Sequence, residues 1–194
     1  MLKQTPSQTV GPYFAYALTP QSYGRRGIGA STLTDMETTG ERIRIEGVVT
    51  DGEGKPIRDS LIEIWQANAA GVYRHPADIR ADAQADPHFS GFGRAGTNDD
   101  GVFFFDTIKP GAIGDGQAPH INVTVFARGM LAHAFTRIYF ADETAANAED
   151  PVLQTVPADR RDTLIAKPAR TAGGTVYRFD IHLQGDAETV FFDA

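Results

Sequence analysis

Short runs in which apolar and polar residues alternate recur along most of this chain, and no long helical pattern lies between them. Residues 42–46 read Arg-Ile-Arg-Ile-Glu, and residues 61–66 read Leu-Ile-Glu-Ile-Trp-Gln. Side chains alternate between two faces along a strand, so these patterns predict half-buried β-strands. Strands joined by turns rather than helices favour an all-β antiparallel sandwich or barrel. Further strands are expected at residues 102–108, 120–127, 135–141 and 175–184, with a loop or broken helix at 76–87 and a loop at 90–101.

The remaining segments are expected to form an arm and two short helices around the sheet. Residues 1–40 carry little periodicity, yet the region around Tyr13 is too apolar for a free tail. An extended N-terminal arm and loop is therefore expected there, packed on its own domain or on a partner chain. Helical patterns at residues 144–150 and 158–165 are short and peripheral. The expected division is an arm over residues 1–40, packed on the partner, and one sandwich domain over residues 41–194.

Composition excludes several classes of function. The chain has 194 residues and a formal net charge of -7, which argues against the basic footprint that nucleic-acid binding needs. It contains no cysteine, so disulfides and thiolate metal sites are ruled out. No signal-peptide pattern is present, and no uncharged apolar run approaches the ~20 residues that span a bilayer. A soluble, cytoplasmic protein without a nucleic-acid or membrane partner is expected.

A Gly/Pro-rich segment at residues 109–119 precedes the strand that begins at His120. His120 and Asn122 are two residues apart on this strand, so their side chains are expected on one face. A polar pair at the mouth of a strand, below a loop, suits a small binding site. The pair could equally be one structurally satisfied histidine and one surface asparagine.

Two other residues have both a functional and a structural interpretation. Tyr73 follows the strand at residues 61–66 across a short turn, and it is either part of a site or a packed ring with a bonded hydroxyl. Arg128 ends an apolar run and is either a solvated charge or a group that attracts an anion. No serine-nucleophile, phosphate-loop or paired-carboxylate pattern is found in the sequence.

Three segments resemble the intradiol ring-cleaving dioxygenase family: LIEIWQANAAGVYRH, FGRAGTNDDGVFFFDTIKPG and APHINVTVFARG. The likeness extends from TPSQTVGPYF near the N-terminus to YRFDIHLQGDAETVFFD near the C-terminus. It implies a transthyretin-like antiparallel β-sandwich. In catalytic members of the family, two tyrosines and two histidines hold a ferric ion. Tyr73 and His120 stand at two of those positions, whereas Ile113 and Asn122 replace the other tyrosine and histidine.

These replacements predict that this chain holds no metal of its own. Ferric iron is a hard cation served best by anionic oxygen, which Ile113 lacks, and the amide of Asn122 is a weak donor. Loss of half the ligand set should abolish binding, since affinity depends on ligand number and geometry. The resemblance places Fe(3+) in a homologous β chain, because some family members pair an α and a β chain in higher αβ oligomers.

The resemblance also implies how such an α chain contributes to catalysis. Its arm helps to wall the partner's site, where O2 opens the ring of protocatechuate (3,4-dihydroxybenzoate). Bare backbone at Gly11 would permit close approach, and Pro12 would fix the path of the arm. Arg128 would attract the substrate carboxylate or form an ion pair with the β chain. The residues assigned to this wall are Thr9, Gly11, Pro12, Tyr13 and Arg128.

Two other functions remain open at this point. A self-sufficient metal enzyme would use Tyr73, His120 and further ligands that the pattern does not reveal. A non-enzymatic module would bind a small aromatic molecule on the same sandwich.

Overall fold

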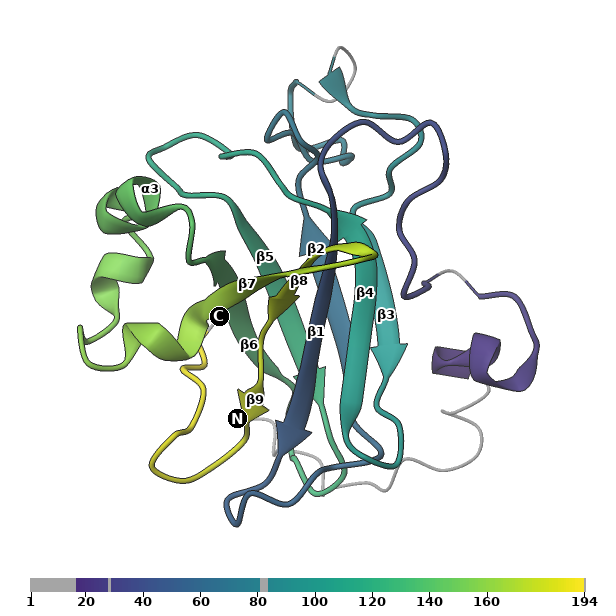
Figure 1. Ribbon diagram of the computed structural model, residues 1–194, viewed down its shortest axis with the longest axis vertical. Helices are drawn as coiled ribbons and strands as arrows, with labels where there is room; N and C mark the ends of the chain where they lie inside the picture. The colour runs from purple at the N-terminus through teal and green to yellow at the C-terminus, as the bar shows by residue number, and fades with distance from the viewer. Residues whose placement is uncertain (1–16, 28, 81–83, 194) are drawn as a thin grey trace, which may run out of the picture.

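The structure, a computed structural model, describes residues 17–27, 29–80 and 84–193 (Figure 1). Strands dominate this part of the chain, and the few helices are short. The strands are β1 (Arg42–Thr50), β2 (Leu61–Gln66), β3 (Phe92–Gly96), β4 (Val102–Ile108), β5 (His120–Phe126), β6 (Ala134–Phe140), β7 (Ile165–Thr171), β8 (Gly174–Arg178) and β9 (Ile181–His182). The helices are α3 (Thr144–Glu149) and the 3-10 turns η1 (Pro20–Tyr23), η2 (Leu153–Thr155) and η3 (Arg161–Leu164).

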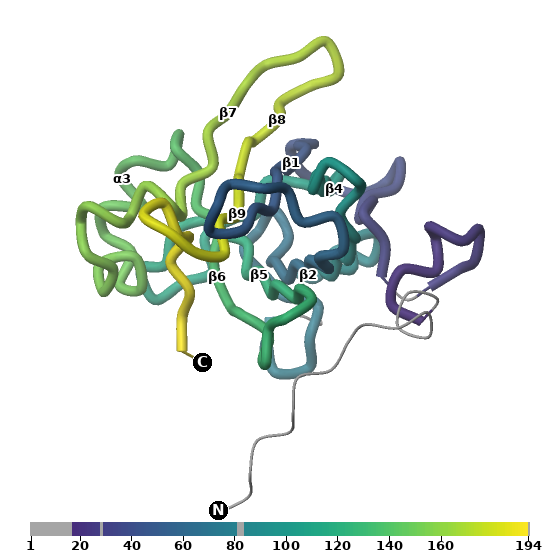
Figure 2. The backbone as a smooth tube through the Cα atoms, turned by 90° about the horizontal axis from the view of Figure 1, so that it is seen from below, coloured from purple at the N-terminus to yellow at the C-terminus, as the bar shows by residue number. Residues whose placement is uncertain are grey.

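The strands form one continuous, strongly bent sheet in the order β3-β2-β5-β6-β7-β8-β1-β4, with β9 paired to β1. β7 pairs with β6 through its first residues and with β8 through the others, so it links two layers into a sandwich that is almost closed. The predicted all-β sandwich is confirmed. Beyond the last residue paired with β6, the β7–β8 hairpin stands out from the body (Figure 2).

The sheet is mainly antiparallel, but three of its pairs are parallel: β6 with β7, β1 with β8 and β1 with β9. Parallel neighbours cannot be joined by a tight turn and need a crossover of a dozen or more residues. Between β6 and β7 that crossover carries α3, η2 and η3. The short helices are therefore the connection that makes one parallel pair possible.

The alternating patterns place one face of each strand in the core. Ile43, Ile45, Ile62 and Ile64 are at most 4% exposed, and the residues between them point outward. Phenylalanines of β4 and valines of β5 fill the space between the layers. A second, smaller core of five buried residues lies under the crossover helices and consists of Ala118, Tyr139, Leu153, Val156 and Leu164.

Three of the predicted segments differ in the structure. The single strand expected at residues 175–184 is interrupted after Arg178 and forms β8 and β9. The loop expected at residues 90–101 contains β3, which pairs with β2 in antiparallel register. A Cβ at Gly93 would lie 2.8 Å from Leu33 and 2.9 Å from Ile64, so packing requires glycine at this position. Glycine is rare inside strands, and it hides the strand pattern in the sequence. In place of the helix expected at residues 158–165, the structure has only the 3-10 turn η3, and β7 begins directly after it, at Ile165. The helix expected at 144–150 is confirmed as α3.

The segment before β1 is bound to the sandwich. The backbone N–H of Leu33 donates to the carbonyl of Asp106 in β4, and the N–H of Arg94 in β3 donates to the carbonyl of Ala30. Leu33 itself is buried in the main core. Thr9, Gly11, Pro12 and Tyr13 lie outside the described residues. Among the described helices, none has the length and apolarity that a membrane span requires.

Candidate functional site

A tight turn after β2 positions Tyr73. The side-chain oxygen of Asn68 accepts hydrogen bonds from the backbone N–H groups of Ala70 and Val72, at 2.9 and 3.0 Å. Gly71 has a positive φ of 75°, and a Cβ there would lie 1.9 Å from the carbonyl oxygen of Ala112. Glycine is therefore required where this turn meets the loop at residues 109–119. The contact brings the loop that carries Ile113 against the segment that carries Tyr73.

The ring of Tyr73 stacks on Trp65 of β2, with ring centroids 5.5 Å apart and an interplanar angle of 19°. Its hydroxyl oxygen accepts a hydrogen bond of 3.1 Å from the side-chain amide of Asn122. Burial raises the pKa of the Tyr73 phenol, although the Asn122 bond opposes the shift. At neutral pH the group is therefore a protonated phenol whose oxygen accepts the Asn122 amide.

His120 is fully buried at the start of β5. Its Nδ1 lies 2.8 Å from the carbonyl oxygen of Ala118 and donates to it, which leaves Nε2 as a lone pair. Nε2 is buried and has no hydrogen-bond partner among the described residues. Burial, reinforced by the charge of Arg137, lowers the pKa of His120 to about 4. The imidazole is therefore neutral at physiological pH.

Side chains from three neighbouring strands meet on the face that carries this site. Asn122 is paired in register with Trp65 of β2 on one side and with Arg137 of β6 on the other. His120 is paired in the same way with Tyr139, and their ring centroids are 5.9 Å apart. Residues directly opposite each other on paired strands share a face. His120 and Asn122 therefore lie on one face, as predicted, and Tyr139 and Arg137 of β6 lie beside them on that face.

Arg137 and Asp150 are neighbours of the site that the sequence analysis missed. Arg137 donates from Nη1 to the side-chain oxygen of Gln117 at 3.0 Å, and the same atom lies 3.5 Å from the hydroxyl of Tyr139. The Tyr139 hydroxyl donates to the buried carboxylate of Asp150 at 3.0 Å. Burial raises the pKa of Tyr139 to about 12. An arginine within the otherwise apolar run Phe-Thr-Arg-Ile-Tyr-Phe was the available signal.

These residues do not fit a ferric centre. The oxygen of Tyr73 already accepts the amide of Asn122, and Ile113, partly buried in the loop, has no donor atom. Only the Nε2 lone pair of His120 retains the character of a free ligand. Within the described ranges, no three His, Asp or Glu side chains converge in a way that could hold a metal ion. The arrangement is a hydrogen-bonded polar cluster. At physiological pH, Tyr73 in this cluster is a neutral phenol and His120 is a neutral imidazole.

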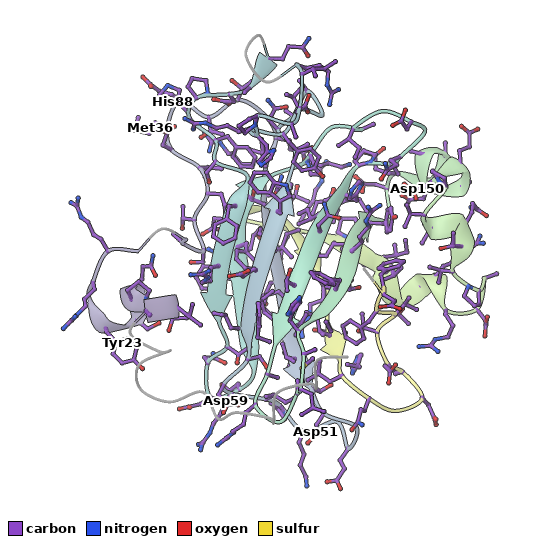
Figure 3. The ribbon with its side chains drawn as sticks, turned by 180° about the vertical axis from the view of Figure 1, so that it is seen from behind. Tyr23, Met36, Asp51, Asp59, His88 and Asp150 are labelled. Atoms are coloured by element: carbon purple, nitrogen blue, oxygen red, sulfur yellow. The ribbon has the colours of Figure 1, made fainter. Side chains whose placement is uncertain are left out.

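Arg128 lies away from this cluster. It follows the far end of β5, whereas His120 begins that strand. Its guanidinium is 2.8 Å from the carboxylate of Asp59, and both side chains are partly exposed. Figure 3 shows Asp59 at the end of the sandwich opposite His88 and Met36. The structure therefore brings together Tyr73, Asn122 and the loop of Ile113, and it separates Arg128 from them.

Comparisons with known proteins agree with this architecture. The family model described as Dioxygenase matches residues 10–185. The protocatechuate 3,4-dioxygenase alpha chain of Burkholderia cepacia is 52% identical over 197 residues, which cover 99% of this chain and 98% of the relative. A protocatechuate 3,4-dioxygenase beta chain from the same species is 40% identical over 165 residues, which cover 80% of this chain and 69% of the relative.

A solved structure shares the fold. The dioxygenase domain of a dioxygenase and carbohydrate-binding protein fusion from Streptomyces sp. SirexAA-E superimposes with a TM-score of 0.60 at 25% identity. The alignment covers 94% of this chain and 99% of that domain. The sequence resemblance, the sandwich and these relatives agree, and the chain belongs to the intradiol dioxygenase family, where it is similar over almost its whole length to an α chain of protocatechuate 3,4-dioxygenase.

Proposed function

We propose that this chain is the α subunit of a protocatechuate 3,4-dioxygenase, and that it completes an active site whose iron is held by a homologous β subunit. One observation carries the proposal: the oxygen of Tyr73 is bonded to the Asn122 amide at 3.1 Å, in a chain that otherwise matches α chains throughout. With Ile113 and Asn122 at the other two positions, the chain offers a ferric ion at most half of the family's ligand set. The iron therefore belongs to the partner.

The similarity to both an α chain and a β chain supports a heteromer. Two homologous chains with the same sandwich can pair across a pseudo-twofold interface and repeat as (αβ)n. A stable α/β interface is expected to bury well over ~1,000 Å². Of the N-terminal arm, residues 1–40, the part that precedes the segment packed on β3 and β4 would contact the β chain, and residues 41–194 would form the sandwich domain.

The substrate follows from the family resemblance and from the names of the relatives. Protocatechuate would bind in the site of the β chain, where the ferric ion would make the dihydroxylated ring reactive toward O2. Both oxygen atoms enter the product, and the bond between the hydroxyl-bearing carbons breaks to give 3-carboxy-cis,cis-muconate. No nicotinamide or flavin is needed, because the four electrons come from the ring. The complex is expected in the cytoplasm.

Residues of this chain would line one wall of the partner's site. Thr9, Gly11, Pro12 and Tyr13 would approach the substrate from the arm. Arg128 would supply a positive charge for the carboxylate of protocatechuate, a role that guanidinium geometry suits. Its distance along β5 from His120 is consistent with service to a neighbouring site, and its ion pair with Asp59 holds it in place.

The test is to express this chain with and without a β homologue and to measure iron in each separated polypeptide. We expect a colourless, inactive chain by itself, and a coloured, active complex in which the β chain retains the metal. Stoichiometric iron in the isolated chain would favour a self-sufficient enzyme instead. Failure to bind any β homologue, with binding of a small aromatic by the chain alone, would favour a non-enzymatic module.

A further inference from the structure

Hydrogen-bond donors stand on the face where the family holds a cation. The amide of Asn122 donates to the Tyr73 oxygen at 3.1 Å and lies 3.4 Å from the carbonyl oxygen of Trp65. Directly across the strand pair, Arg137 is in register with Asn122. Side chains in such a pair share one face and lie within contact distance. A neutral donor and a cationic donor are therefore adjacent beside the former ligands.

The charge of Arg137 is not neutralised by an ion pair in the described part of the chain. Its hydrogen bonds go to the neutral oxygens of Gln117 and Tyr139, and it takes part in none of the ion pairs formed there. Asn122, its partner in register, donates to the Tyr73 oxygen, and Tyr139, whose hydroxyl lies 3.5 Å from Nη1 of Arg137, has its ring centroid 5.9 Å from that of His120. A permanent positive charge therefore lies one side chain away from each former ligand, beyond Asn122 for Tyr73 and beyond Tyr139 for His120, and the nearest buried carboxylate, Asp150, is bonded to the Tyr139 hydroxyl rather than to Arg137.

The remaining half of the ligand set is otherwise well preserved. His120 keeps its Nδ1–H on the Ala118 carbonyl, the arrangement that leaves Nε2 free to bind a metal. The oxygen of Tyr73 is held by the stack on Trp65 and remains on the same face. Two missing ligands explain why the site is weak. They do not explain why a cation stands beside the ligands that remain.

We propose that Arg137 is a positioning residue that takes over the electrostatic role of the lost metal ion and keeps metal ions out of this site. Its guanidinium satisfies Gln117 and repels any cation that approaches Tyr73 and His120. Replacing Ile113 and Asn122 with ligands is therefore not sufficient to restore metal binding. Arg137 must also lose its charge. The inference concerns the isolated chain and holds whether or not a β subunit binds.

The test uses the isolated chain in three variants and the wild type. The first carries Ile113→Tyr and Asn122→His, the second adds Arg137→Gln, and the third adds Arg137→Lys instead. Each protein is loaded with ferrous iron in air and freed of excess metal by gel filtration. Iron per chain and visible tyrosinate-to-iron absorption are then measured. Arg137→Lys keeps the charge while changing the shape, so it separates repulsion from simple obstruction.

We expect the Arg137→Gln triple variant to bind iron at least about a hundredfold more tightly than the double variant, because it removes one like charge beside a multivalent cation. The double variant and the Arg137→Lys triple variant should remain colourless. Equal iron in the double and the Gln triple variant would overturn the proposal. So would a folded Gln triple variant, checked by circular dichroism, that binds no iron.

A single substitution keeps the proposal testable if the triple variant does not fold. Arg137→Gln alone leaves Tyr73 and His120 in place, and Cu2+ binds most nitrogen sites more tightly than other divalent ions. Calorimetric titration should show about tenfold tighter Cu2+ binding to Arg137→Gln than to wild type or Arg137→Lys. Identical Cu2+ affinity in all three proteins would sink it.

Discussion

The hydrogen bond between Asn122 and Tyr73 joins two positions at which the family resemblance implies metal ligands. The phenol oxygen, half-buried beside Trp65, requires a hydrogen-bond partner, and the Asn122 amide supplies one. Histidine at residue 122 would offer ring nitrogens in place of this amide. One substitution therefore weakens a metal site and at the same time satisfies the group it leaves behind.

Tyr73→Phe tests this structural role. The change removes the acceptor of one partly buried hydrogen bond while the stacked ring remains, so the free energy of unfolding should fall by about 1 kcal/mol. Urea unfolding of the isolated chain measures that loss. Turnover of the α/β complex should stay within about twofold of wild type, because the proposed function places the reaction at the iron of the β chain and assigns Tyr73 no part in it. A loss of about a hundredfold in kcat would contradict the assignment.

Arg128→Ala tests attraction of the substrate. If the guanidinium draws the carboxylate toward the partner's iron, KM for protocatechuate should rise about tenfold, with a smaller change in kcat. Steady-state kinetics of the complex measure both. The matched control is Asp59→Asn, which removes the 2.8 Å ion pair but leaves the cation. The control should leave KM nearly unchanged, since an exposed pair contributes about 1 kcal/mol or less.

Connections between strands depend on a few buried polar groups. Asp150 ends α3, is fully buried and accepts hydrogen bonds from Tyr139 and from the backbone N–H groups of Ala118, Val152 and Leu153. It ties the end of the 109–119 loop to the crossover between β6 and β7. The second core beneath the loop and the crossover is small, so we expect the Asp150 carboxylate to contribute much of the stability of these two segments.

Asp150→Ala should lower the free energy of unfolding by about 3 kcal/mol, because several buried donors lose their acceptor at once. Chemical denaturation of the isolated chain measures the change. Asp159→Ala is the matched control at an exposed carboxylate of the same crossover, and it should change stability by less than about 0.5 kcal/mol. Similar effects of the two substitutions would show that Asp150 does not organise the crossover.

The segment before β1 is fastened to the loop before β3 by a pH-dependent contact. His88 lies 3.0 Å from Asp35 and 3.0 Å from Glu37, and the Thr38 hydroxyl donates to the His88 carbonyl at 2.7 Å. The hydrogen bond to Asp35 raises the pKa of His88, and the same bond contributes most to lowering the pKa of Asp35 to about 2. This contact is strongest when His88 is charged.

The sign of the pH effect follows from the raised pKa of His88. Its stabilisation is complete below the unfolded pKa of about 6.5 and is lost as pH rises through the folded value. Thermal unfolding between pH 6 and pH 9 should therefore show a decline in Tm that His88→Gln reduces. His133→Gln, at an exposed histidine with no carboxylate partner in the described residues, should retain the wild-type slope. Identical slopes in all three proteins would refute the contact's contribution.

At the scale of the whole molecule, the two layers of the sandwich are held together by the apolar core between them. Isoleucines of β1 and β2 and phenylalanines of β4 pack between the two layers, and no described ligand set fastens them. Burial of apolar surface is the dominant favourable term in folding. A chain of this kind can lose the iron chemistry of its family and keep the sandwich.

An iron chelator should therefore leave the isolated chain unaffected. Only a ligand that binds the folded state raises Tm, so Tm with and without deferoxamine should agree to within about 1 °C. Differential scanning calorimetry makes the comparison, and the complex with its β partner serves as the positive control. A drop of several degrees in the isolated chain would show that it carries a stabilising metal after all.

Several elements were predictable because their signal is local. The alternation at residues 42–46 and 61–66 reports which face is buried, and the structure places β1 and β2 there. β3 was missed because Gly93 and Ala95 break the pattern, and its pairing with β2 depends on space left by Leu33 and Phe105. The start of β7 was missed because a 3-10 turn runs directly into it.

The residue order alone was enough for the fold class and for the prediction of an incomplete ligand set, since Ile113 and Asn122 can be read as residue types without knowing where they lie. Only the tertiary structure decided what replaces that chemistry. Tyr73 meets Asn122 across 49 residues, and Arg137 reaches the same face through strand register. Strand patterns and ligand types are local properties, whereas such contacts depend on how turns and register bring distant segments together.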